Sequence, residues 1–121
     1  MSLVAVLLSV SIQGHAQTGS SSQFERGAQV YQQHCGLCHG PDGRGGQGFA
    51  RPIWGAGHDI AKFGSARGLF DYVQLLMPFD DPQKVNDDDK LAVIAFMLVR
   101  NGTLKQDQVL ERSKAAATEI K

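Results

Sequence analysis

Apolar positions recur with helical spacing in three segments of the chain. The first segment follows Ser22, which lies three residues before Glu25, the spacing of a helix-capping box. The residues on its apolar face are small or aromatic: Phe24, Gly27, Ala28 and Tyr31. This pattern predicts an amphipathic helix at the start of the fold.

The second segment covers residues 65–76 and ends before Pro78, which disfavours helical angles at Met77. Its apolar residues again fall at helical spacing: Leu69, Phe70, Val73 and Leu76. The pattern therefore predicts a second helix that stops close to Met77.

The third segment begins near Asn86, has acidic residues at positions 87–89 and ends at Arg100, before Asn101 and Gly102. Acids in the first turn, a base in the last and a glycine beyond it all suit a helix dipole and its C-terminal cap. The predicted buried stripe is Leu91, Ile94, Ala95 and Leu98. Met97 is expected to lie off this stripe.

No segment alternates with period two for long enough to predict a sheet, so the expected fold class is all-α. A long glycine-rich stretch over residues 40–64 separates the first two helices. Such a loop in a small domain indicates function or an additional scaffold, and three short helices make a poor core. We therefore expect a large apolar group in the middle of the fold.

Composition limits the class of protein. The 121 residues are enough for one domain, with 42% hydrophobic residues and four prolines against fourteen glycines. Twelve basic and twelve acidic residues give no net charge, which argues against a nucleic-acid partner.

The N-terminal residues 1–16 predict a signal peptide. An apolar run at 3–12 is too short for a membrane span, and small residues at 14 and 16 suggest cleavage after Ala16. The alternative is a retained helix that lies on a partner or a membrane. The predicted organisation is a signal at 1–16, a linker at 17–22, a domain at 23–103 and an extension at 104–121. That extension is either a frayed tail or a docking arm.

Residues 35–39 read Cys-Gly-Leu-Cys-His, the motif by which haem is attached. Cys35 and Cys38, three positions apart, can each form a thioether with a haem vinyl group, and His39 can then ligate the iron. Three alternatives remain open: a thioredoxin-like redox pair, a zinc site that uses His34 and His58, and a plain disulfide. The haem interpretation supplies the missing apolar mass, and secretion fits it.

Met77 lies thirty-eight residues after His39 and is the expected second axial ligand. A thioether favours low-spin iron with a raised reduction potential, and two filled axial positions favour electron transfer over chemistry at the metal. His58 is the rival ligand, and an open sixth site is the remaining alternative.

These residues resemble the class I cytochrome c family over about residues 24–102. The resemblance implies three core helices around one covalently bound haem c, with Gly27 and Phe96 at the crossing of the first and last helices. It also implies that the carbonyl of Pro52 accepts a hydrogen bond from the His39 ring. Trp54, Arg51 and Lys62 are expected either to contact the haem propionates or to have packing and surface roles.

Residues 77–83, Met-Pro-Phe-Asp-Asp-Pro-Gln, resemble the cytochrome subunits of periplasmic sulfite dehydrogenases and of related dehydrogenases. Leu91 departs from that pattern, in which a tyrosine is expected. The resemblance implies a periplasmic electron carrier, without enzymatic activity of its own, that takes electrons from a dehydrogenase and passes them to a cytochrome or terminal oxidase. No membrane span is expected once the signal is cleaved. The alternative function is a haem enzyme or ligand sensor with a labile sixth site.

Overall fold

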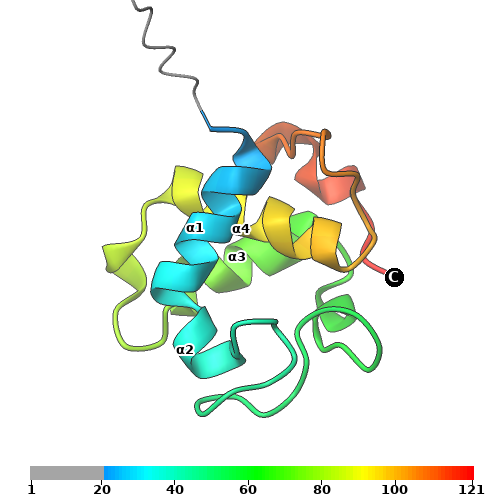
Figure 1. Ribbon diagram of the computed structural model, residues 1–121. Helices are drawn as coiled ribbons and strands as arrows, with labels where there is room; N and C mark the ends of the chain where they lie inside the picture. Colours follow the sequence, from blue (N-terminus) through cyan, green and yellow to red (C-terminus); the bar gives the residue numbers. More distant parts are fainter. Residues whose placement is uncertain (1–20) are drawn as a thin grey trace, which may run out of the picture.

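The computed structural model describes residues 21–121, and all of its regular elements are helical (Figure 1). In chain order they are α1 (Gln23–His34), α2 (Gly36–His39), η1 (Ile60–Phe63), α3 (Ala66–Leu76), η2 (Pro82–Lys84), α4 (Asp87–Arg100) and η3 (Arg112–Ala117), where η denotes a 3₁₀ helix. Across residues 21–121 the β pairing is limited to an isolated bridge between Ser65 and Glu119. The all-α prediction is confirmed. The predicted signal peptide lies outside the described residues, as does most of the predicted linker.

Helix α1 begins as its sequence predicts. The Ser22 hydroxyl accepts a hydrogen bond from the Glu25 amide at 3.1 Å, and the Glu25 carboxylate accepts one from the Ser22 amide at 2.9 Å. This reciprocal pair satisfies two amides that the first turn would leave without partners. The helix buries Gly27, Val30 and Tyr31 on the face turned to the core.

Helix α4 also has the expected ends. The Asn86 side chain accepts a hydrogen bond from the Asp89 amide at 2.9 Å, and Gly102, beyond the C-cap Asn101, has a φ of +80°. The predicted stripe is too narrow, however. Met97 is buried with 6% exposure, whereas Leu91 is only partly buried. The helix is covered on more than one side, so a single amphipathic stripe does not describe it.

Helices α1 and α4 cross at Gly27 (Figure 1). A Cβ built on Gly27 would lie 2.1 Å from the carbonyl oxygen of Ala92 and 2.7 Å from the Cβ of Phe96. The absence of a side chain therefore lets the two backbones approach, as the resemblance implied. Near the N-terminal ends of both helices, Arg26 donates two hydrogen bonds to the Asp89 carboxylate, at 2.7 and 2.6 Å.

Helix α3 begins close to the predicted residue, and its N-cap is Ser65, whose hydroxyl accepts a hydrogen bond from the Gly68 amide at 3.3 Å. Leu69 and Phe70 are buried, and Val73 packs against the core from a partly exposed position. The end of the stripe differs from the prediction, since Leu76 is about half exposed.

Residues 104–121 fold back on the domain. The Ala66 amide donates to the Thr118 carbonyl at 2.8 Å, and the Ile120 amide donates to the Gly64 carbonyl at 3.0 Å. Leu110, Ala115 and Ile120 are buried in the same hydrophobic core as the helices. The segment therefore completes this core rather than fraying from it, and it contains the 3₁₀ helix η3.

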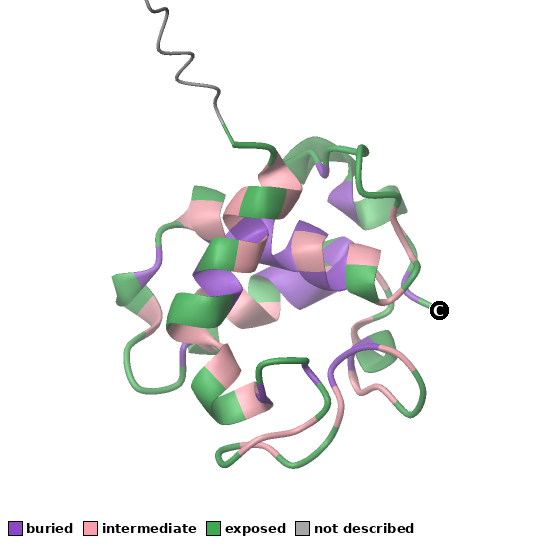
Figure 2. Cartoon of the chain, in the orientation of Figure 1, coloured by how far each residue is buried: buried purple, intermediate pink, exposed green. Residues whose placement is uncertain are grey.

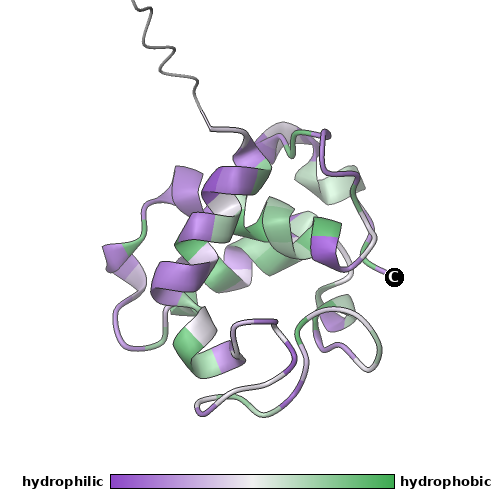
Figure 3. Ribbon diagram, viewed as in Figure 1, coloured by the Kyte–Doolittle hydropathy of each residue, from purple (hydrophilic) through white to green (hydrophobic). Residues whose placement is uncertain are grey.

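Burial is greatest on the inner sides of α1, α3 and α4, and the outer side of α1 is exposed and hydrophilic (Figures 2 and 3). None of the helices within residues 21–121 has both the length and the apolar character needed to cross a membrane.

Candidate functional site

The residues of the Cys-x-x-Cys-His motif lie in a sharp helical corner. Cys35 ends α1 with its amide bonded to the Tyr31 carbonyl at 2.9 Å, and α2 begins at the next residue. The His39 amide donates to the Cys35 carbonyl at 3.0 Å, so one short turn fixes the distance between the first thiol and the imidazole. The local sequence alone therefore determines how these side chains are spaced.

The glycine-rich loop closes directly over this corner. The amides of Gly48 and Phe49 both donate to the Cys38 carbonyl, at 3.1 and 3.0 Å. A Cβ on Gly48 would lie 2.9 Å from the Cys38 sulfur, so the loop passes here only because the residue has no side chain. On the inner side the Tyr31 hydroxyl donates to the Gly40 carbonyl at 2.6 Å. The loop and α1 together hold the motif in place.

A cavity of about 690 Å³, a volume that includes its opening to solvent, lies beside the motif. Its walls come mainly from apolar side chains of α1, α3, α4 and η1, and they include Cys35, His39, Leu69, Val73, Met77 and Met97. This predominantly apolar lining is typical of a site for an apolar ligand. Cys38 is exposed at the outer side of the corner.

Burial is the main cause of the shifted pKa values of Cys35 and His39, two groups on this cavity. It raises the pKa of the Cys35 thiol to about 12, with a smaller contribution from Cys38. A redox-active pair requires a lowered thiol pKa and normally follows a strand, whereas Cys35 follows a helix. The structure therefore does not support the thioredoxin-like alternative. Burial also lowers the pKa of His39, which favours the neutral imidazole that binds metals.

The other two alternatives for the cysteines also lack support. Both thiols are free. Within residues 21–121, no group of three or more His, Cys, Asp or Glu side chains is arranged to hold a metal ion.

The cavity residues fit the haem that the sequence predicts. The Nδ1 atom of His39 is buried and has no hydrogen-bond partner, which leaves this imidazole unsatisfied beside an apolar space. Cys35 lies on the same wall, and Met77, from beyond the end of α3, also lines the cavity. A covalently attached porphyrin with an iron ion would need these groups: a thiol, an imidazole and a soft sulfur.

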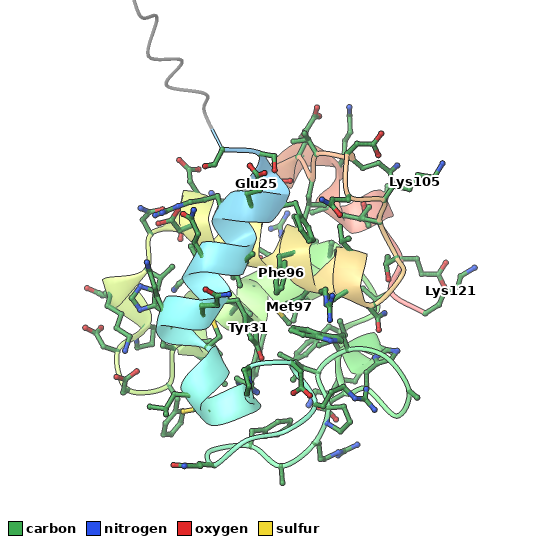
Figure 4. All side chains as sticks on the ribbon, viewed as in Figure 1. Glu25, Tyr31, Phe96, Met97, Lys105 and Lys121 are labelled. Atoms are coloured by element: carbon green, nitrogen blue, oxygen red, sulfur yellow. The ribbon has the colours of Figure 1, made fainter. Side chains whose placement is uncertain are left out.

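A second methionine lies on this cavity. Met97, which the sequence suggested would lie off the buried stripe, lines it together with Met77. Figure 4 shows Met97 in the interior, near Tyr31 and Phe96, where α1 and α4 meet. The sequence contained a signal for this position, because Met97 follows Val93 by four residues and so shares a helix face with it. In the structure Val93 also lines the cavity. His58, the predicted rival of Met77, is not among the lining residues.

The residues that follow the motif contact the site less directly than expected. The Pro52 carbonyl accepts a hydrogen bond from the Asp59 amide at 3.0 Å, and the expected bond from the His39 ring is absent. Trp54 is buried in an aromatic cluster, with its ring centroid 5.0 Å from that of Tyr31 and 5.6 Å from that of Phe96. Neither residue lines the cavity.

Arg51 and Lys62 share one carboxylate at the cavity. Arg51 forms a salt bridge with Asp59 at 3.1 Å, Lys62 forms another, and the hydrogen bond from Lys62 is the main cause of the lowered pKa of Asp59. Asp59 and Lys62 line the cavity, whereas Arg51 does not. Sequence reasoning missed Asp59, for which the only signal was its place between the two basic residues.

Comparison with known proteins gives one family. The family described as "Cytochrome C oxidase, cbb3-type, subunit III" matches residues 22–97, which include the whole motif and Met77. A search of curated proteins finds no match.

Two solved structures share the fold. The sulfane dehydrogenase SoxCD from Paracoccus pantotrophus matches with a TM-score of 0.69 and 24% identity, over 80% of this chain and 52% of the other. The thiosulfate dehydrogenase TsdBA from Marichromatium purpuratum matches with a TM-score of 0.52 and 26% identity, over 61% of this chain and 17% of the other. The chain thus spans about half of the first structure and about a sixth of the second.

Proposed function

Because this chain belongs to the family of c-type cytochromes described as cytochrome c oxidase, cbb3-type, subunit III, we propose that it is a one-electron carrier with a single haem c. The observation that carries the proposal is the convergence of Cys35, His39 and Met77 on one apolar cavity, where the His39 ring has a buried nitrogen without a partner. Cys38, one helical turn from Cys35, supplies the second thiol.

Each of these residues has a separate task. Cys35 and Cys38 would hold the haem by thioether bonds, and His39 and Met77 would be the two protein ligands of its iron. A haem held in this way would supply one-electron chemistry. The apolar walls exclude water from the site, and the burial that lowers the His39 pKa keeps its imidazole available as a ligand.

With His39 and Met77 both bound to the iron, no position would remain on the metal for a substrate. This favours an electron carrier over an enzyme. Large apolar side chains are exposed near the motif and near Met77: Leu37 is 79% exposed and Phe79 is 85% exposed. Exposed apolar side chains of this size suit transient contact with a redox partner.

The donor in this proposal is a periplasmic dehydrogenase, and the acceptor is a cytochrome or a terminal oxidase. Two likenesses support this choice: residues 77–83 resemble dehydrogenase-linked cytochromes, and one solved structure of similar fold is a thiosulfate dehydrogenase. Purification of the tagged protein from periplasm tests it. A dehydrogenase that contains molybdenum or a quinone cofactor should be retained, and recovery of only other classes of enzyme would contradict the assignment.

The axial ligand is tested by Met77→Ala, with Met97→Leu as the matched control on the same cavity. Oxidised wild-type protein should show the red charge-transfer band of iron bound to a thioether. Met77→Ala should lose this band, because the thioether proposed as the ligand is removed, and Met97→Leu should keep it. A band that persists in Met77→Ala and disappears in Met97→Leu would assign the ligand to Met97. Rapid binding of carbon monoxide to reduced wild-type protein would instead indicate the open sixth site.

A further inference from the structure

Lys90 is a buried lysine with no acidic partner among its hydrogen bonds. It lies in the second turn of α4, is 3% exposed and is the one charged residue buried in the described part of the chain. Its ammonium donates to the carbonyl of Gln74 at 2.8 Å and to the carbonyl of Pro82 at 2.6 Å. A charged group is kept away from water only where such bonds compensate for the lost hydration.

The two acceptors lie on either side of Met77. Gln74 is in the last turn of α3, where the carbonyl groups have no partner within the helix, and Pro82 begins η2 after the loop. A positive charge at this end of α3 also suits the negative end of its dipole. Lys90 thus joins the two ends of the segment 75–81 to α4, whose own residues Val93 and Met97 line the cavity.

Other bonds hold the same segment less firmly. The Met77 amide donates to the Val73 carbonyl at 3.0 Å, and the Gln74 side chain donates to Asp87 at 2.8 Å. Lys84 of η2 pairs with Asp80 at 2.6 Å, but the Asp80 side chain is exposed to solvent. Among the residues that the structure describes, only Lys90 connects both ends of the segment from a buried position.

The geometry points to Lys90 as a positioning residue that holds Met77 at the cavity. Through two charge-assisted hydrogen bonds it fixes the backbone on both sides of Met77, and it thereby keeps the thioether directed at the iron. The inference rests on the proposed function, in which Met77 is the axial ligand.

The test compares holoprotein carrying Lys90→Met with holoprotein carrying Lys105→Met, in which an exposed lysine on the C-terminal segment is changed. Methionine keeps the length of the side chain but donates to neither carbonyl. Loss of these two hydrogen bonds, offset in part because an uncharged methionine avoids the cost of burying the ammonium, corresponds to about a tenfold change in an equilibrium. Imidazole, as an added ligand of the iron, should therefore bind Lys90→Met about tenfold more tightly than wild type, because the Met77 segment is released more often. Lys105→Met should bind imidazole as wild type does.

Amide hydrogen exchange gives a second readout that does not depend on the iron. Residues 77–81 should exchange about tenfold faster in Lys90→Met than in wild type, while the amides of α1 remain unchanged. Lys90→Arg, which keeps two donors, should restore both properties in part. If Lys90→Met does not accumulate, Lys90→Gln takes its place, since an amide can reach at most one of the two carbonyls.

The outcomes separate the inference from the function on which it rests. If wild type lacks the charge-transfer band, the proposed ligation by Met77 is wrong. The exchange rates then still report whether the hydrogen bonds of Lys90 hold the segment 75–81. If wild type shows the band but imidazole affinity and exchange in the Lys90 variant match those of Lys105→Met, the positioning role is overturned. A uniform rise in exchange across α1 and α4 would also overturn it, because Lys90 would then only stabilise the fold.

Discussion

Gly27 is the residue on which the approach of α1 to α4 depends. A side chain there would overlap the backbone of Ala92, which is held in a helix and cannot move aside by itself. Gly27→Ala should therefore destabilise the holoprotein by about 2 kcal/mol, since overpacking of a close contact costs about 1–3 kcal/mol. Helix propensity alone gives the opposite sign, because alanine is favoured over glycine by about 1 kcal/mol inside a helix.

Urea unfolding of the holoprotein measures this change. Gln29→Ala, at an exposed position of the same helix, is the control and should alter the free energy of unfolding by less than about 0.5 kcal/mol. If Gly27→Ala proved as stable as wild type, the close contact with α4 would not be needed.

The placement of single residues was predictable where it depends on local spacing. Cys35 and His39 belong to one helical turn, and Met77 precedes the proline that follows α3, and the structure brings these three residues to one cavity. Roles that depend on contacts between distant segments were not predictable in this way. The Pro52 carbonyl is bonded to the Asp59 amide, in a loop whose path no periodic pattern determines. Trp54, in the same loop, packs on Tyr31, which is one of the two roles expected for it.

At the scale of elements, the three long helices follow from their sequences. Each begins with a cap in which the side chain just before the helix accepts a hydrogen bond from the amide three residues later. The capping residues are Ser22, Ser65 and Asn86. The apolar stripe predicted for α4 was less accurate than those of the other helices, because one side of α4 packs on α1 and another side lines the cavity. A lysine in such a helix is normally interpreted as solvent-facing, yet Lys90 precedes Ile94 by four residues and Met97 by seven. That spacing places it on the buried side.

The short 3₁₀ helices were not predicted. At η2 a local signal was present, because Asp81 precedes Pro82 and its side chain accepts a hydrogen bond from the Gln83 amide, the pattern of a turn set by its own residues. The C-terminal segment differs: its pairing with Gly64 and Ala66 joins residues more than fifty positions apart. Weak apolar content in residues 104–121 gave no sign that Leu110 and Ile120 would be buried.

At the scale of the whole molecule, the start of α1 and the C-terminal segment 104–121 contact each other, so both ends of the described chain pack on one core. Gln23, in the first turn of α1, exchanges two hydrogen bonds with the backbone of Leu110, at 2.9 and 2.7 Å. Arg112 forms a cation–π contact with Phe70, 4.6 Å from the ring centroid. The helices and the C-terminal segment are thus tied together around the cavity, which lies among α1, α3 and α4 rather than on the surface of a finished core.

The position of this cavity makes the stability of the fold depend on what fills it. Its walls include Leu69 and Val93, apolar side chains that gain their full contacts only when the space is occupied. An unfilled space costs stability in proportion to its volume, and a group bound only by the folded state raises the free energy of unfolding.

The double variant Cys35→Ala/Cys38→Ala, which cannot attach haem, should therefore be largely unfolded at 25 °C. Circular dichroism should show most of the helical signal lost and no cooperative thermal transition, whereas wild-type holoprotein should unfold cooperatively. A cooperative transition in the haem-free variant would mean that α1, α3 and α4 form a sufficient core by themselves.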